Sequence, residues 1–216
     1  MAGNDIISRV SPTFLALVYA EPIAELAVLD VGTGWGRVAL QLAPRCRRVV
    51  GIDRETSLIE EARRRASAAG LSNAEFIVAD AETEEYSVFA PDMICAHLCM
   101  SDAIAERAGR ALVPGRVFAF VAFETEQWRE TGRPSRFSYD EARARAVLDT
   151  NGFSVERLEI ERETQRYDSV EAALAAVVGL EDRWRRDGRW FRYLKFLEDG
   201  GRTLTRSHLL VKARRR

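Results

Sequence analysis

Three glycines at alternate positions, Gly32, Gly34 and Gly36, follow closely after an acidic residue, Asp30. An apolar run precedes Asp30, and residues 37–43 after the loop have the pattern of a helix. A glycine-rich turn between a buried strand and a helix lets a ligand lie against the main chain, because no Cβ atom is in the way. The residues therefore predict a binding site for a nucleotide-like cofactor.

The spacing of this loop differs from the dinucleotide fingerprint Gly-x-Gly-x-x-Gly/Ala. Arg37 occupies the position of the third glycine of that fingerprint. The carboxylate of Asp30 would also repel a pyrophosphate, whereas it would attract a cationic amine. The loop is therefore better suited to a ligand with an amino-acid end. A nicotinamide-dependent oxidoreductase stays open as the least favoured alternative.

Four later segments have the composition of buried strands, and the first three end in a polar residue. They are residues 49–53, 76–80, 92–97 and 116–123, with Asp53, Asp80 and His97 at the ends of the first three. Together with the glycine loop, these segments resemble the class I S-adenosylmethionine (SAM) dependent methyltransferases over residues 26–160. The resemblance implies SAM as the cofactor and S-adenosylhomocysteine as the product.

The same resemblance implies an α/β fold. It is a three-layer sandwich with a seven-stranded, mostly parallel sheet in the order 3-2-1-4-5-7-6, whose last strand is antiparallel. Residues 153–160 alternate as a sixth strand, and residues 207–212 have the composition of the seventh. The 216 residues are enough for a single domain, 1–216. Within it, residues 1–25 are expected to form an N-terminal helical cap.

The resemblance also assigns roles in cofactor binding. Asp30 would act on the methionine ammonium through water or the loop backbone, although it could instead cap the following turn. Asp53 would accept hydrogen bonds from the ribose hydroxyls, or else cap a helix. Asp80 would accept from the adenine amine, and the N–H of Ala81 would reach the ring. The expected cofactor-binding residues are Asp30, Gly32, Thr33, Gly34, Gly36, Asp53, Arg54, Asp80, Ala81 and His97.

His97 is the candidate catalytic residue. It would lie where the strand order reverses, which is where ligands bind in open α/β sheets. An imidazole can take a proton near neutral pH, although a purely structural histidine is the commoner case. The implied chemistry is direct in-line displacement, which needs a base only for a protonated oxygen or nitrogen. The sequence has no cluster with metal-ligand spacing, so no metal is expected.

Residues 161–205 separate the last two predicted strands and are expected to form a helical insertion. Within it, residues 183–193 mix arginine with Trp, Phe and Tyr. Basic and aromatic side chains can bind single-stranded RNA, but the insertion could equally be a substrate lid or a homodimer contact. Upstream, Ser138 and Glu141 form a capping box that predicts a helix ending at Thr150.

A small molecule is the expected methyl acceptor. RNA and a SAM-binding protein without turnover remain alternatives. Residues 96–99 lack the Asn/Asp-Pro-Pro-Tyr/Phe signature of methyltransferases that act on amino groups of bases or on glutamine. The net charge is −1, but residues 161–216 carry 14 basic and 9 acidic side chains. Three cysteines, without a secretory signal or an apolar run of membrane length, favour a cytoplasmic protein with no membrane partner.

Overall fold

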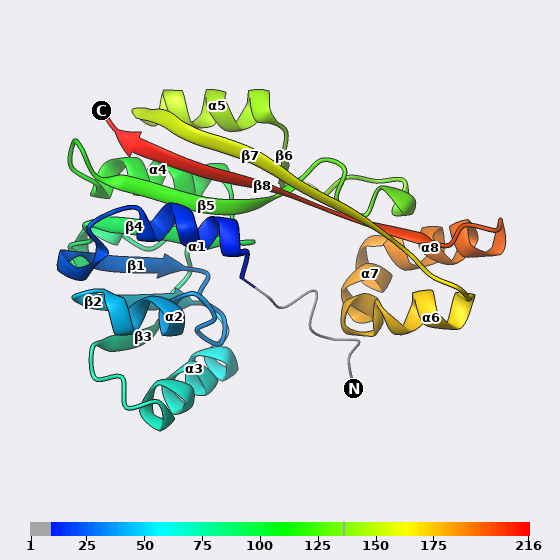
Figure 1. Ribbon diagram of the computed structural model, residues 1–216, viewed down its shortest axis with the longest axis horizontal. Helices are drawn as coiled ribbons and strands as arrows, with labels where there is room; N and C mark the ends of the chain where they lie inside the picture. The colour runs from blue at the N-terminus through cyan, green and yellow to red at the C-terminus, as the bar shows by residue number, and fades with distance from the viewer. Residues whose placement is uncertain (1–9, 136) are drawn as a thin grey trace. The chain divides into compact units, whose positions relative to one another are not determined.

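The computed structural model describes residues 10–135 and 137–216, and these residues contain an eight-stranded sheet in the order β3-β2-β1-β4-β5-β8-β7, with β6 paired to β5 (Figure 1). The strands are β1 (Ala27–Val31), β2 (Arg48–Asp53), β3 (Ala74–Val78), β4 (Met93–His97), β5 (Val117–Glu124), β6 (Ser138–Tyr139), β7 (Phe153–Arg166) and β8 (Thr203–Arg215). With β7 and β8 as the sixth and seventh strands, the predicted α/β sheet is confirmed. The two-residue β6 is an addition to it.

Eight α-helices occur in the part of the chain that the structure describes. They are α1 (Pro12–Tyr19), α2 (Ala39–Leu42), α3 (Thr56–Ala68), α4 (Asp102–Ala111), α5 (Glu141–Thr150), α6 (Val170–Ala175), α7 (Glu181–Asp187) and α8 (Arg189–Glu198). Serine hydroxyls cap three of them, because the side chains of Ser11, Ser101 and Ser169 each accept a backbone N–H from the first turn.

The chain divides into two compact units. The first, here called the sheet unit, comprises residues 10–122, 141–159 and 210–216. The second, here called the helical unit, comprises residues 123–140 and 160–209.

The sheet unit is built on parallel strands. Strand β1 pairs in parallel with β2 and β4, so Asp30 lies opposite Gly51 on one side and Cys95 on the other. The side chains of alternate strand residues point to opposite faces, and both faces are buried. On one face, Val28, Val49 and Met93 pack in a single apolar cluster with residues of α1, α2 and α3. The sheet is thus the middle layer of the sandwich.

The end of β8 runs antiparallel to the start of β5. The N–H of Gly115 donates to the carbonyl of Arg215, whose own N–H donates to the carbonyl of Arg116. In the helical unit, the N–H of Tyr167 donates to the carbonyl of Arg202, which joins the end of β7 to the start of β8. Both strands are longer than the sequence predicts, and they run side by side in Figure 1.

The helical unit has an aromatic core. Helices α6, α7 and α8 lie between β7 and β8 in the chain, as the predicted insertion requires. Trp128, Trp184 and Tyr193 form the centre of a cluster in which the ring centroids of neighbouring pairs are 5.2 and 5.5 Å apart. Such edge-on ring pairs stabilise a core beyond their buried area.

Two predicted helix starts are wrong. Ser138 lies in β6, where its hydroxyl donates to the carbonyl of Ser135, and α5 begins only at Glu141; its end at Thr150 is as predicted. The helix after the glycine loop begins at Ala39 rather than at residue 37, because residues 34–38 form turns. At the N-terminus, the described part of the predicted cap consists of α1 and the 3-10 turn Ile23–Glu25, and residues 1–9 lie outside the described residues.

Candidate functional site

The glycine loop requires glycine at specific positions. Gly32, Gly34 and Gly36 have φ angles of +66°, +56° and +87°, in the left-handed region. A Cβ atom added to Gly32 would lie 2.2 Å from Sγ of Cys99, so the loop packs tightly at this point. A Cβ atom on Gly34 would meet no atom within 4 Å. The loop is therefore closely packed at Gly32. At Gly34 the space beside the main chain is empty, so a ligand can approach it there.

The buried carboxylate of Asp30 fixes the glycine loop through two hydrogen bonds. Its Oδ2 accepts hydrogen bonds from Oγ1 of Thr33 at 2.6 Å and from the N–H of Ala39 at 3.1 Å. The residue is 1% exposed, and this burial raises the pKa of Asp30 to about 6, although both hydrogen bonds act in the opposite direction. The carboxylate thus caps the start of α2 and fixes the loop backbone, which fits an action of Asp30 through the loop.

The carboxylate of Asp53 binds the backbone at the tip of the glycine loop. Its Oδ2 accepts the N–H of Gly34 at 2.9 Å, and its Oδ1 accepts the N–H of Glu55 at 3.0 Å. The second bond belongs to the turn before α3, so part of the predicted helix-capping role is present. Each carboxylate oxygen retains a further lone pair that can accept a hydroxyl. Arg54 next to it is exposed.

Asp80 and Ala81 follow β3. Oδ1 of Asp80 accepts the N–H of Glu82 at 2.9 Å, which forms a tight turn. The carbonyl of Ala81 accepts the hydroxyl of the buried Tyr86 at 2.5 Å. Because the Ala81 carbonyl is fixed in this way, the backbone of the turn is held in place while Asp80 stays partly exposed.

His97 is the last residue of β4 and is 6% exposed. Its ring lies 5.7 Å from the ring of Phe14 on α1. The next residue, Leu98, has a φ of +59°, which is unusual for a residue with a Cβ atom, and its N–H donates to the carbonyl of Val121 at 2.7 Å. This sharp turn after β4 places Cys99 against Gly32.

Sequence reasoning missed Cys99 as a part of this site. Burial, and then the charges of Asp53 and Asp30, raise the pKa of the thiol to about 12, so it is protonated at neutral pH. The side chain acts as a packing surface under Gly32. No local pattern reveals this contact, because the two residues lie on different strand ends.

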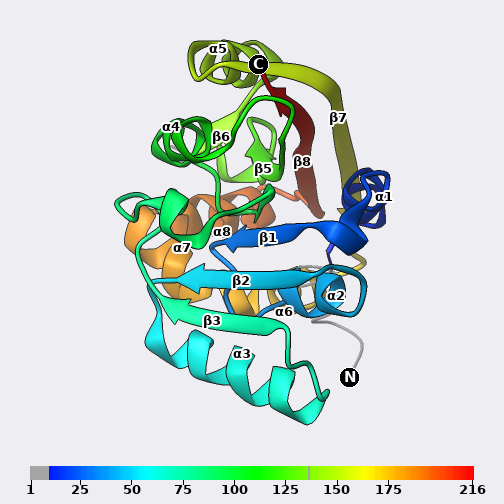
Figure 2. The same cartoon turned by 90° about the vertical axis from the view of Figure 1, so that its left-hand side faces the viewer.

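The predicted cofactor-binding residues all belong to the sheet unit and lie at the carboxyl ends of β1, β2, β3 and β4. In Figure 2 the arrowheads of β1, β2 and β3 point the same way. The open main chain at Gly34, with a carboxylate beside it, fits a ligand that carries an amino-acid end and hydroxyl groups.

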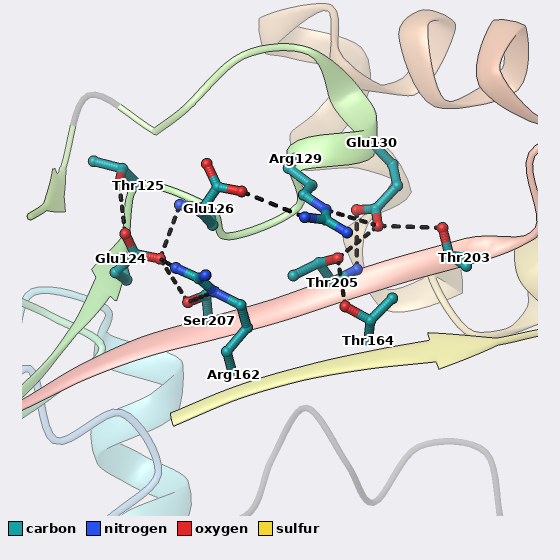
Figure 3. A network of polar contacts seen from close by, with 10 residues as sticks. All are labelled: Glu124, Thr125, Glu126, Arg129, Glu130, Arg162, Thr164, Thr203, Thr205 and Ser207. Atoms are coloured by element: carbon teal, nitrogen blue, oxygen red, sulfur yellow. Dashed lines mark hydrogen bonds and ion pairs between the residues drawn. The ribbon is translucent and has the colours of Figure 1, made fainter. Parts of the chain in front are cut away.

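Other polar residues after β5 have structural partners. Glu124 is 4% exposed, and its carboxylate accepts hydrogen bonds from Oγ of Ser207, Oγ1 of Thr125 and Nη2 of Arg162, at 2.6, 2.5 and 2.9 Å (Figure 3). Burial alone would raise the pKa of Glu124, but these bonds outweigh it and lower the pKa to about 2. The carboxylate fastens β5 to β7 and β8.

The Arg/aromatic segment 183–193 is largely internal. Trp184, Trp190 and Tyr193 are at most 7% exposed, whereas Phe191 is 60% exposed. Three of the four aromatic rings are therefore packed inside the helical unit and do not offer a face on which a base could stack.

A sequence model of the methyltransferase-domain family matches residues 24–142, which is more than half of the chain. The chain belongs to this family. The match covers the glycine loop and the ends of β2, β3 and β4, so the predicted cofactor-binding residues lie within the family's domain. This is a family of SAM-dependent methyltransferases, and SAM is the cofactor.

A curated protein matches a part of the chain in sequence. The chain is 40% identical over 72 residues to the 23S rRNA (uracil(1939)-C(5))-methyltransferase RlmD of Stenotrophomonas maltophilia, which is 33% of the chain and 16% of that protein. The chain thus spans about a sixth of the length of this relative.

Solved structures match over nearly the whole chain. YcgJ of Bacillus subtilis has a TM-score of 0.70 at 17% identity, over 94% of this chain and 97% of YcgJ. An S-adenosylmethionine-dependent methyltransferase of Mesorhizobium loti has a TM-score of 0.60 at 18% identity, over 94% and 96%. At these identities the likeness establishes the fold.

Within residues 10–135 and 137–216, no helix is both long and apolar enough to span a membrane. In the same residues, no group of three or more His, Cys, Asp or Glu side chains could hold a metal ion.

Proposed function

We propose that this protein transfers the methyl group of SAM to an oxygen or nitrogen of a small-molecule acceptor. The proposal rests on the hydrogen bond that the N–H of Gly34 donates to the carboxylate of Asp53. At this point, at the carboxyl edge of the sheet, the main chain is open and lies beside a carboxylate. SAM, when bound, supplies a methyl group on a positively charged sulfur, which a nucleophile can attack directly.

We assign the binding roles from this geometry. The main chain at Gly32 and Gly34 takes the amino-acid end, while Asp30 supplies negative charge through the loop that it holds. Asp53 takes the ribose hydroxyls, with Arg54 beside it. Asp80 and the N–H of Ala81 take the adenine.

His97 is the proposed proton acceptor for an acceptor hydroxyl or ammonium. It closes β4 next to β1, where the strand order reverses, and Phe14 packs against its ring. Most of the rate acceleration would come from positioning, which can contribute about 7–11 kcal/mol in favourable cases. A base adds to this only when the attacking atom carries a proton.

Calorimetric titration with SAM, S-adenosylhomocysteine and NAD tests the cofactor assignment. We expect both SAM and its product to bind, and NAD not to bind. Asp53→Ala should weaken SAM binding about 10- to 100-fold, because it removes hydrogen bonds to a charged acceptor. Asp102→Asn, an exposed carboxylate on α4, is the matched control and should bind SAM normally. Binding of NAD alone would overturn the proposal.

RNA is the second candidate acceptor, and the similarity to RlmD favours it. The buried rings of residues 183–193 argue against stacking as the mode of binding. Affinity for RNA that falls steeply with salt, together with methyl transfer to RNA, would favour this candidate over a small molecule.

A further inference from the structure

The helical unit contains two buried N–H groups that have no hydrogen-bond acceptor among the described residues. They are Nε1 of Trp184, whose side chain is fully buried, and Nε of Arg189, a residue that is 6% exposed. A buried donor without a partner is costly, and such groups in native proteins usually find a partner in a bound water, ion or ligand.

Both side chains lie against Trp128. The rings of Trp128 and Trp184 are 5.2 Å apart, and the guanidinium carbon of Arg189 is 6.0 Å from the centroid of the Trp128 ring. Trp128 itself has a φ of +58°, a strained conformation for a bulky residue. The three residues Trp128, Trp184 and Arg189 are here called the Trp128 site.

Hydrogen bonds hold Trp128 in this conformation. Its N–H donates to the carbonyl of Thr205 at 2.9 Å. The carboxylate of Glu130 in turn accepts the N–H and the hydroxyl of Thr205, at 2.9 and 2.6 Å (Figure 3). The strain is therefore maintained by a dedicated set of contacts, which keeps the indole beside the two unmatched donors.

The Trp128 site has surplus positive charge. The other nitrogens of Arg189 pair with Asp187 and donate to the carbonyl of Pro134 at 3.2 Å. Burial lowers the pKa of Arg189; Asp187 opposes this, whereas the charges of Arg183 and Arg133 add to it. Asp187 is the ion-pair partner of Arg189. Two further positive charges thus act on Arg189 besides this pair.

A ligand that fits here must accept hydrogen bonds and carry negative charge. We propose that the Trp128 site binds the oxyanion of a small molecule, a carboxylate or a phosphate, through Nε1 of Trp184 and Nε of Arg189. A buried water could satisfy the two donors, but it would leave the surplus charge without a counter-ion. That the molecule is the methyl acceptor rests on the proposed function; the oxyanion site itself does not.

Titration of the whole protein with inorganic phosphate and with benzoate, followed by its tryptophan fluorescence and without SAM, tests the site. We expect saturable binding of at least one ion. Trp184→Phe keeps an aromatic ring, although a smaller one, but removes the N–H, so it should weaken binding about tenfold. The smaller ring leaves a cavity in the aromatic core, so the melting temperature should also fall. Trp190→Phe is the matched control, since the N–H of Trp190 is not among the unsatisfied donors.

Arg189→Lys provides a second variant that keeps the positive charge. It lacks the planar donor fork and should also weaken binding about tenfold. Stronger binding of benzoate identifies a carboxylate ligand, and stronger binding of phosphate identifies a phosphate ligand. The proposal is overturned if neither ion binds, or if binding is the same in Trp184→Phe and Arg189→Lys as in the wild type.

Because these titrations contain no SAM, oxyanion binding can be observed even if the protein does not bind SAM. Likewise, SAM binding can be observed even if no oxyanion binds. If the acceptor carries the oxyanion, Trp184→Phe should raise its KM about tenfold with little change in kcat. An unchanged KM would separate the oxyanion from the methyl acceptor.

Discussion

The two units differ in what fills their interiors. The sheet unit has a large apolar cluster and buries Asp30 next to its glycine loop, whereas the helical unit buries Arg189 beside an aromatic cluster and Glu124 in a network of side-chain hydrogen bonds. In the first, the backbone itself forms the candidate site, and only glycine fits at its tightest point. In the second, side-chain hydrogen bonds set the shape. Cofactor binding should therefore depend on steric fit in the loop, and acceptor recognition on individual polar contacts.

The largest effect is expected from Gly32→Ala. The new Cβ atom would lie 2.2 Å from Sγ of Cys99 and would force a residue with a side chain into a positive φ. Overpacking and strain together should lower the free energy of unfolding by about 2–5 kcal/mol. Thermal and urea unfolding measure this loss.

Two variants separate the steric clash from the strain. Gly34→Ala has open space around its Cβ atom, so it should cost about 1–2 kcal/mol of stability and yet weaken SAM binding. Adding Cys99→Gly to Gly32→Ala should restore part of the lost stability. Equal losses in Gly32→Ala and Gly34→Ala would contradict tight packing under Gly32.

Glu124→Gln should have the next largest effect, this time in the helical unit. The amide cannot match four donors, so the free energy of unfolding should fall by about 2–3 kcal/mol. Glu126→Gln, whose carboxylate is 43% exposed, is the control and should stay within about 0.5 kcal/mol.

The pKa of Glu124 adds a pH dependence. Because the folded-state pKa of about 2 is below the ordinary value of 4.5, the wild type should lose this stability as the pH falls from about 4.5 to about 2. Glu124→Gln should lack that part of the loss. Parallel acid-unfolding curves for the two proteins would contradict the assigned role.

The smallest effect concerns Asp30 and pH. Its pKa of about 6 means that the carboxylate loses its charge as the pH falls through 6, so SAM affinity should decrease over that range. The unliganded protein should behave in the opposite way, since a raised pKa makes protonation favour the folded state between about pH 6 and pH 4. Calorimetry at several pH values measures the SAM affinity of the wild type and of Asp30→Asn, and unfolding experiments at the same pH values measure their stability. A SAM affinity of the wild type that does not change with pH would contradict the proposed role of Asp30.

The fold, and the position of the candidate cofactor residues at the strand ends, were predictable because their signals are local. The glycine loop, Asp53 and Asp80 each sit at a strand end that the sequence marks by itself. The start of α5 was misplaced because Ser138 pairs with Phe123 of β5, a partner far away in the chain that the local pattern does not reveal.

The rest depends on contacts between residues far apart in the chain. Gly32 meets Cys99 across two strand ends, and Glu124 meets Ser207 from β8. The positive φ of Trp128 follows from contacts with Thr205 and has no local signal. The arginines and aromatic rings of residues 183–193 suggested a surface that could bind RNA. The pattern was misleading because the fold buries most of these rings.

The most direct test of the central claim is the formation of S-adenosylhomocysteine from methyl-labelled SAM, in the presence of small-molecule acids, their uncharged esters, or RNA. We predict product formation with label transferred to a small molecule, strongly reduced in Asp53→Ala and shifted in its pH profile in His97→Gln. Tight binding of SAM without product from any acceptor, or label found only in RNA, would contradict it.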